Sequence, residues 1–186
     1  MLALTSDRAE YLPRFEHIPM VYRDYVGIHS ERIFFLIWMN RPLFKKIFWE
    51  DFNDHYLTLY AKIHDILEWL SPFGDIPTPL KLWLSQRSQE VMDLVERKLW
   101  EIYIQRIPLA HWEYEYDEAM LEDMITKKSL ESQVLSYFDK VDGFITCFHE
   151  LVAGNKDFLV PFHNYIAIFK DIKFWKKLAN LLPLFQ

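Results

Sequence analysis

Apolar residues recur at intervals of three and four along most of this chain, and no segment of any length alternates apolar with polar residues. Intervals of three and four place apolar side chains on one face of an α-helix, whereas a half-buried strand alternates apolar with polar residues. Only four glycines interrupt the 186 residues, and 51% of the residues are hydrophobic, which is ample for one large core. The sequence therefore predicts an all-α fold, a single-domain helical bundle over residues 1–186.

Prolines and glycines mark the expected ends of the helices, because neither residue continues a helix well. Residues 11–27 contain two prolines and should form a loop with a short helix at most. We expect helices over residues 30–40, which Pro42 ends, 51–70, which Asp51 or Asn53 caps, 85–105, and 131–153, which Gly154 closes. Residues 109–123 should form a loop that runs into a short helix, and residues 156–185 should supply one or two further helices. Residues 71–79 hold three prolines and a glycine and should form a fixed loop.

The overall charge and the length of the apolar runs exclude several kinds of partner. A net charge of −6 and a pI near 5.6 disfavour binding to a nucleic acid polymer or an anionic membrane, since both need basic surface. The longest strongly apolar run, residues 33–39, is too short to span a bilayer. Cys147 is the only cysteine, and residues 1–6 lack the pattern of a secretory signal. We expect a cytoplasmic protein that acts on a small molecule.

Four residues form a candidate metal site. His64 and Asp65 are adjacent within the expected helix 51–70, where an ionised carboxylate needs a cation or hydrogen-bond donors. His29 lies far upstream, and Asp139 lies far downstream among core-like neighbours. Imidazole and carboxylate together suit divalent first-row transition metals, which can generate a nucleophile from water at neutral pH. We predict that these four side chains hold one metal ion.

Two alternatives remain open from the residues alone. Asp142, one turn after Asp139, is a competing ligand on the same expected helix. Alternatively there is no metal: His64 is a hydrogen-bonded core histidine, Asp65 pairs with a lysine such as Lys62, and Asp139 faces solvent. A histidine followed by an aspartate is by itself a weak motif in a chain with seven histidines.

Three short stretches resemble the HD-domain phosphohydrolases, most closely the bacterial 5′-deoxynucleotidases. Residues 28–30 (IHS) resemble the family's EHS, and residues 64–68 (HDILE) with 74–81 (GDIPTPLK) resemble HDxxE followed by GDxPTPxK. Residues 150–155 (ELVAGN) resemble ELAAGN downstream of the last aspartate. The motif core therefore runs from residue 28 to residue 155, and the resemblance implies an HD-type helical bundle. It departs from the family at Ile28, which replaces a glutamate.

The resemblance also implies roles at the metal centre. His29, His64, Asp65 and Asp139 would be the ligands of one divalent Co, Mn, Zn or Fe ion. Glu68, one turn after the central pair, would position or deprotonate a water molecule and later protonate the leaving oxygen. An ordinary surface ion pair is the alternative for Glu68.

Further residues would bind the substrate. Asp75 would accept a hydrogen bond from the sugar hydroxyl, unless it only caps a turn. Thr78 would also bind the substrate, and the prolines beside it, Pro77 and Pro79, would form a wall of the base pocket. Lys81 would offset phosphate charge, unless it is simply solvated. The family's phosphate-binding arginine precedes a tryptophan and a proline, but the local alignment here gives residues 17–19 (HIP). The N-terminal candidates for phosphate contact are therefore His17, Arg14 and Arg23.

The expected function is hydrolysis of deoxynucleoside 5′-monophosphates, with release of phosphate. One alternative is a deoxynucleoside triphosphate triphosphohydrolase, as in some small viral relatives of the family. Another is a helical interaction module without turnover, with the aromatic residues 44–60 and the acidic residues 113–122 as contact surfaces. The resemblance also implies a homo-oligomer, a dimer or larger, which the same aromatic segments could bury.

Overall fold

A computed structural model describes residues 11–15, 17–48, 52–65, 68, 86–106 and 118–171. The helices in these ranges are α2 (Val26–Phe48), α3 (Asp54–Ile63), α6 (Gln86–Arg106), α7 (Glu118–Thr126), α8 (Leu130–Val152), the 3₁₀ helix η3 (Lys156–Phe158) and α9 (Leu159–Asp171). The same residues contain no strand, only an isolated antiparallel bridge between Pro13 and Tyr25. The all-α prediction is confirmed.

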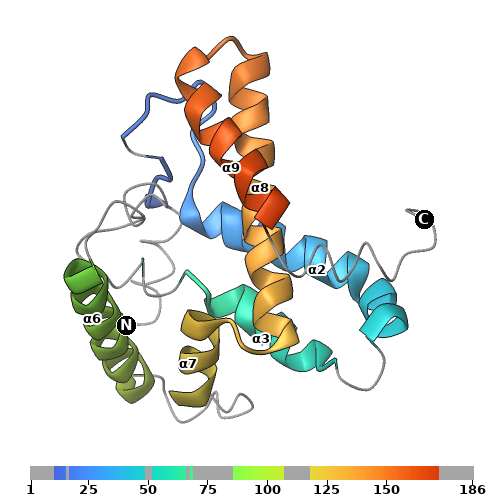
Figure 1. The fold of residues 1–186 in the computed structure, drawn as a ribbon, viewed down its shortest axis with the longest axis vertical. Coiled ribbons are helices and arrows are strands. Elements are labelled where there is room, and N and C mark those ends of the chain that lie inside the picture. The colour runs from blue at the N-terminus through green and yellow to red at the C-terminus, as the bar shows by residue number, and fades with distance from the viewer. Residues whose placement is uncertain are drawn as a thin grey trace.

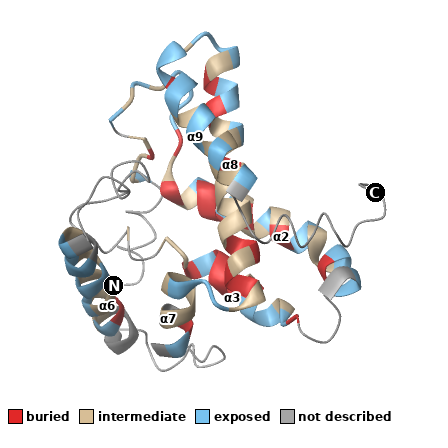
Figure 2. Cartoon of the chain, viewed as in Figure 1, coloured by how far each residue is buried: buried red, intermediate tan, exposed pale blue. Residues whose placement is uncertain are grey.

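Three helices form the centre of the molecule. α2, α3 and α8 each contact the other two, and α9 turns back through η3 to pack along the C-terminal half of α8 (Figure 1). Their buried side chains cluster where the three helices cross (Figure 2). The core includes Ile33, Ile37 and Phe44 from α2, Leu57, Tyr60 and Ile63 from α3, and Val134 and Leu135 from α8. Trp100 of α6 and Met120 of α7 extend this core.

Helix α2 is longer than predicted at both ends, and the expected stop at Pro42 is wrong. The helix runs from Val26 to Phe48 with Pro42 inside it. An internal proline costs about 3 kcal/mol, because it removes a backbone hydrogen bond and crowds the preceding turn. Phe44, two residues further on, is only 3% exposed and packs its ring against Phe52 and Phe138. Burial of such a ring contributes about 1.5–3 kcal/mol, which offsets much of that cost.

Helix α3 begins as predicted but ends early. The side chain of Asn53 accepts hydrogen bonds from the backbone N–H groups of residues 55 and 56, so Asn53 is the N-cap. The helix ends at Ile63, and His64 is its C-cap residue, whereas residues 51–70 were expected to be helical. Glu68 is again helical, and residues 66, 67, 69 and 70 lie outside the described residues. Two contacts compete with the helix: the His64 ring bonds the carbonyl oxygen of Ala61 at 3.0 Å, and Asp65 turns toward His29 of α2. His64 and Asp65 therefore lie at the end of α3 rather than inside it.

The bounds of α6 and α8 agree with the sequence within about one residue, whereas α7 ends at Thr126, three residues beyond the expected end at 123. Gly154 follows α8 with φ +92°, the left-handed conformation expected at such a stop. Gly143 allows α9 to approach α8, because a Cβ atom there would clash with the phenol ring of Tyr165. The predicted loop 71–79 and the part of 156–185 beyond Asp171 lie outside the described residues.

The aromatic residues 44–60 and the acidic residues 113–122, predicted as contact surfaces, can be compared with the structure where it describes them. Within the aromatic segment, Phe44, Phe52 and Tyr60 are at most 7% exposed, so these rings fill the core and cannot serve as a contact surface, whereas Tyr56 is 42% exposed. Residues 113–117 of the acidic segment are outside the described part of the chain. Among the described helices, none combines the length and the apolar character needed to cross a membrane.

Candidate metal centre

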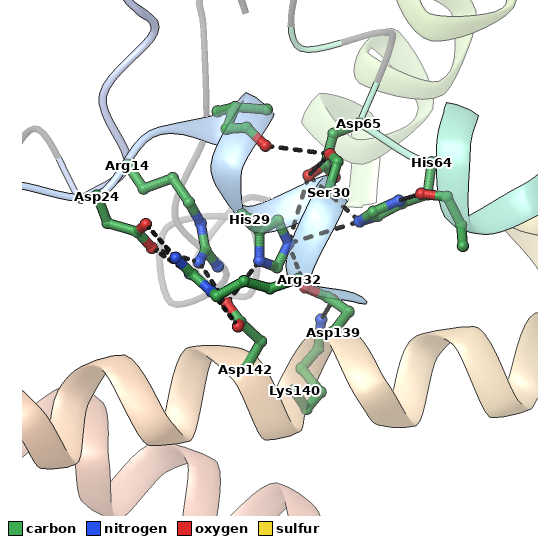
Figure 3. A network of polar contacts seen from close by, with 12 residues as sticks. Arg14, Asp24, His29, Ser30, Arg32, His64, Asp65, Asp139, Lys140 and Asp142 are labelled. Carbon is green, nitrogen blue, oxygen red and sulfur yellow. Dashed lines mark hydrogen bonds and ion pairs between the residues drawn. The ribbon is translucent and has the colours of Figure 1, made fainter. Parts of the chain in front are cut away.

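The predicted ligands converge from three helices (Figure 3). Nε2 of His29, on α2, lies 3.3 Å from Oδ2 of Asp65 and 3.3 Å from Oδ1 of Asp139, on α8. Nε2 of His64, at the end of α3, lies 3.2 Å from Oδ2 of Asp65 and 3.5 Å from Nε2 of His29. The mutual contacts of α2, α3 and α8 thus bring together residues that are 110 positions apart in sequence, from 29 to 139.

The donor atoms of His29, His64 and Asp139 lie within 4.8 Å of one another, as the ligands of one metal ion would, and Asp65 contacts Nε2 of both imidazole rings. Two atoms that each lie about 2.1 Å from one ion are about 3.0 Å apart at a right angle and about 3.4 Å apart at the tetrahedral angle. The separations of 3.2–3.5 Å between neighbouring donor atoms correspond to this range. Two imidazole nitrogens and two carboxylate oxygens also form a donor set that first-row transition metals favour.

Hydrogen bonds turn both imidazole rings the same way. Nδ1–H of His64 donates to the carbonyl oxygen of Ala61 at 3.0 Å. Nδ1–H of His29 donates to Oδ2 of Asp142 at 2.7 Å, an assignment that follows because an ionised carboxylate can only accept. In its neutral form, each ring therefore directs the lone pair of its Nε2 atom toward Asp65 and the other ligands. Ser30 adds a weaker contact, with Oγ 3.4 Å from Oδ2 of Asp65.

Asp142 does not occupy the position of a ligand. Its carboxylate lies on the Nδ1 side of His29, whereas Asp65 and Asp139 lie on the Nε2 side. Asp139 is the α8 carboxylate within the ligand cluster, and its second oxygen contacts Nζ of Lys140. The arrangement without a metal also predicted that Asp139 faces solvent, but its side chain is only 25% exposed and reaches His29.

The charges of the cluster control its protonation. Burial lowers the pKa of His29, and so does Arg14, but the nearby carboxylates outweigh both and raise it to about 9. Burial raises the pKa of Asp65, yet the two imidazole rings bring it down to about 2. The pKa of Asp139 is well below its ordinary value, because Lys140 and His29 overcome the effect of burial. At neutral pH the carboxylates are ionised and ready to bind a cation, whereas His29 must first lose a proton.

The other predicted site residues are distributed differently. Arg14 is buried and pairs through Nη1 with Asp24 at 2.9 Å and with Asp142 at 3.0 Å. His17 and Arg23 are exposed. The backbone N–H of Glu68 donates to the carbonyl oxygen of Asp65 at 3.0 Å, so the backbone of Glu68 lies next to that of Asp65. Asp75, Thr78, Pro79 and Lys81 lie outside the described residues.

Sequence reasoning missed the residues that hold the N-terminal loop. Glu150 is only 1% exposed, and its carboxylate accepts from the backbone N–H groups of Val21 at 2.8 Å and Tyr22 at 2.7 Å. Nδ2 of Asn155 donates to Glu150 at 2.7 Å and to the carbonyl oxygen of Pro19 at 2.7 Å. The ELVAGN stretch therefore fastens the loop that carries Arg14. The motif was visible in the sequence, but its partner was not.

Sequence comparison identifies the family. The profile of the YfbR-like 5′-deoxynucleotidases matches residues 3–176. The chain belongs to this family. It is 28% identical over 164 residues to the 5′-deoxynucleotidase YfbR of Escherichia coli, covering 82% of this chain and 74% of the relative. A 5′-deoxynucleotidase of Pectobacterium atrosepticum is 26% identical over 151 residues, covering 81% and 73%. Membership makes the chain a hydrolase of the 5′-deoxynucleotidase kind.

Solved structures show the same fold at lower identity. An HD-domain phosphohydrolase of Listeria innocua matches with a TM-score of 0.70 and 20% identity, over 96% of this chain and 84% of its own. A conserved hypothetical protein of Pyrococcus furiosus also matches with a TM-score of 0.70 and 20% identity, over 96% and 94%. The predicted HD-type helical fold is confirmed by these neighbours.

Proposed function

We propose that this chain hydrolyses deoxynucleoside 5′-monophosphates in a reaction that needs one divalent metal ion. The observation that carries the proposal is the convergence of His29, His64, Asp65 and Asp139, with neighbouring donor atoms 3.2–3.5 Å apart. The names of the curated relatives support the substrate class, since both are described as 5′-deoxynucleotidases. Co, Mn, Zn and Fe in the divalent state all suit this donor set.

The residues of the centre would divide the work of hydrolysis. A bound divalent ion would lower the pKa of a water molecule and orient the phosphate. Glu68 would accept a proton from the attacking water and later deliver a proton to the 5′ oxygen of the sugar. The bond between phosphorus and that oxygen breaks, the water supplies the new oxygen, and the products are a deoxynucleoside and inorganic phosphate. Asp65 and Asp139 would remain ionised throughout, in line with their lowered pKa values.

Substrate contacts are proposed from the family pattern. Asp75 would accept a hydrogen bond from the sugar hydroxyl, Thr78 and Pro79 would line the base pocket, and Lys81 would neutralise phosphate charge. Among the N-terminal candidates, His17 and Arg23 are favoured over Arg14. Their side chains are exposed, whereas Arg14 is buried, pairs with Asp24 and Asp142, and lies on the Nδ1 side of His29, away from the ligand atoms.

The balance of charge near the centre favours a monophosphate over a triphosphate. Arg14 and Arg32 are each paired with both Asp24 and Asp142, and Lys140 is paired with Asp139. Cations that are already matched by carboxylates offer little to offset the additional charge of a triphosphate. An interaction module without turnover is also disfavoured, because binding a partner through the helical surface does not require four side chains arranged as metal ligands. We further propose, on family analogy, a homo-oligomer.

A product analysis tests the proposal. Protein reconstituted with Mn or Co is incubated with each deoxynucleoside and ribonucleoside mono- and triphosphate, and the products are separated by chromatography. The proposal predicts inorganic phosphate from deoxynucleoside monophosphates, and loss of both metal retention and turnover in Asp65→Ala. Release of intact triphosphate would establish the triphosphohydrolase instead. An absence of product with every metal would refute an enzymatic role.

A further inference from the structure

A cluster of four charged residues lies behind His29, on the side away from the predicted metal. It consists of Arg14 and Asp24 from the N-terminal loop, Arg32 from α2 and Asp142 from α8 (Figure 3). Asp24 and Asp142 are 6% and 2% exposed, and Arg14 is 7% exposed. Two positive and two negative charges balance within this charge cluster. The side chain of Arg32 is 38% exposed, so the cluster reaches the surface on that side. A balanced and largely buried cluster is weak evidence for stability by itself, because desolvation consumes most of the attraction.

The charge cluster fixes the orientation of one carboxylate in particular. Arg32 binds Asp142 through two bonds, from Nε to Oδ1 at 2.7 Å and from Nη2 to Oδ2 at 2.8 Å. Arg14 adds a third, from Nη1 to Oδ2 at 3.0 Å. A planar guanidinium that holds both oxygens leaves the carboxylate little freedom to rotate. Oδ2 is thereby directed at Nδ1 of His29, 2.7 Å away.

We propose that Asp142 is a positioning residue of the metal centre: held by Arg32 and Arg14, it keeps the proton of neutral His29 on Nδ1 and aims Nε2 at the metal. This inference rests on the proposed metal-dependent function. Carboxylates that accept from the second nitrogen of a ligating histidine set its tautomer and ring angle, and their loss weakens metal binding about 10–100-fold. Asp142 would therefore act on the metal without touching it.

The chain offers a matched control for this role. Asp24 is also buried and pairs with the same two arginines, from Arg32 Nη1 and Nη2 at 2.8 Å each and from Arg14 Nη1 at 2.9 Å. Among the described residues, however, the carboxylate that contacts Nδ1 of His29 belongs to Asp142 and not to Asp24. Asp24→Asn and Asp142→Asn remove the same charge from the same charge cluster, and only the second alters the support of the imidazole ring.

Cobalt titration of the two variants tests the inference. Wild-type protein, Asp24→Asn and Asp142→Asn are titrated with cobalt(II) alone, with the visible absorption band as the signal and circular dichroism as the check on folding. We expect a 10–100-fold weaker dissociation constant and an altered band for Asp142→Asn, and wild-type values for Asp24→Asn. Equal losses in both variants, or no loss in Asp142→Asn, would overturn the proposal.

A measurement on wild-type protein guards against a variant that does not fold. In zinc-loaded protein with ¹⁵N-labelled histidine, the His29 ring should show a protonated, hydrogen-bonded Nδ1 and a metal-bound Nε2 by NMR. Metal bound through Nδ1, or an Nδ1 proton that exchanges freely with water, would refute the role of Asp142. The proposed function fails separately, if wild-type protein binds no metal. If wild-type protein binds metal and turns over while Asp142→Asn matches it, only this inference fails.

Discussion

Metal binding should displace a proton from His29, and the size of the effect follows from the surroundings of its ring. Burial and Arg14 both favour the neutral ring, but the adjacent carboxylates prevail and raise the pKa of His29 to about 9. The ring is therefore protonated at neutral pH in the metal-free protein. Only the neutral ring can bind a metal, so protons compete with the ion for His29. The carboxylate of Asp65, with a pKa of about 2, has no proton to lose.

The pH dependence can be calculated from this competition. For a pKa of about 9, the neutral fraction of His29 rises from about 1% at pH 7 to about 50% at pH 9. The apparent affinity for cobalt should therefore rise about 50-fold over this interval and level off at higher pH. Because the pKa of His29 is raised, its ring holds the proton below about pH 9. The free-energy cost of removing that proton before metal binding therefore grows as the pH falls.

Isothermal titration calorimetry measures this effect directly. Titrations with cobalt at about pH 7, in two buffers of different ionisation enthalpy, give the number of protons released. His29→Gln should bind more weakly and release about one proton fewer than wild-type protein. An affinity that is the same at pH 7 and pH 9 would refute the reasoning, since His29 would then not be protonated before the metal binds.

Three further predictions concern stability. In metal-free protein, the raised pKa of His29 stabilises the fold below about pH 6.5, and this contribution is lost as the pH rises through about 9, so the thermal midpoint should fall over that window. Phe44→Ala should cost about 3–5 kcal/mol in urea unfolding, whereas Phe35→Ala, at a position 55% exposed, should cost at most about 0.5 kcal/mol; similar losses would contradict the packing of α2. Glu150→Ala should cost about 1–3 kcal/mol and speed hydrogen exchange at the amides of residues 21–22, and unchanged exchange would show that Glu150 does not hold the loop.

The ligands of the candidate centre could be predicted because each is a polar group in an apolar setting. Asp65 and Asp139 would be costly to bury without a partner, and this cost makes both of them candidates from the sequence alone. Their convergence depends on how α2, α3 and α8 cross, which no local pattern records. The family motifs supplied that missing geometry, because they link distant positions of one chain.

The ends of the helices were less predictable, because tertiary contacts decide them. Pro42 lies within α2 since Phe44 gains enough from the core to keep the helix continuous. α3 ends at Ile63 because His64 and Asp65 make contacts outside the helix. In both places a local preference is outweighed by burial or by charge.

The role of Asp142 could not be separated from that of Asp139 by sequence. The two residues are three positions apart on α8 and share a face, so spacing alone makes them equivalent candidates. The structure separates them by the nitrogen of His29 that each contacts. One feature of the sequence could have helped. Arg32 lies three residues after His29 on the same face of α2, so a carboxylate that pairs with this arginine would lie close to His29.

Anomalous diffraction from a crystal grown with cobalt tests the central claim most directly. We expect one strong cobalt peak, bound by Nε2 of His29, Nε2 of His64 and the carboxylates of Asp65 and Asp139, with Asp142 on the opposite side of the His29 ring. A peak held by other residues, or a cobalt ion that leaves out His29 or Asp139, would contradict the proposed centre and the hydrolytic mechanism built on it.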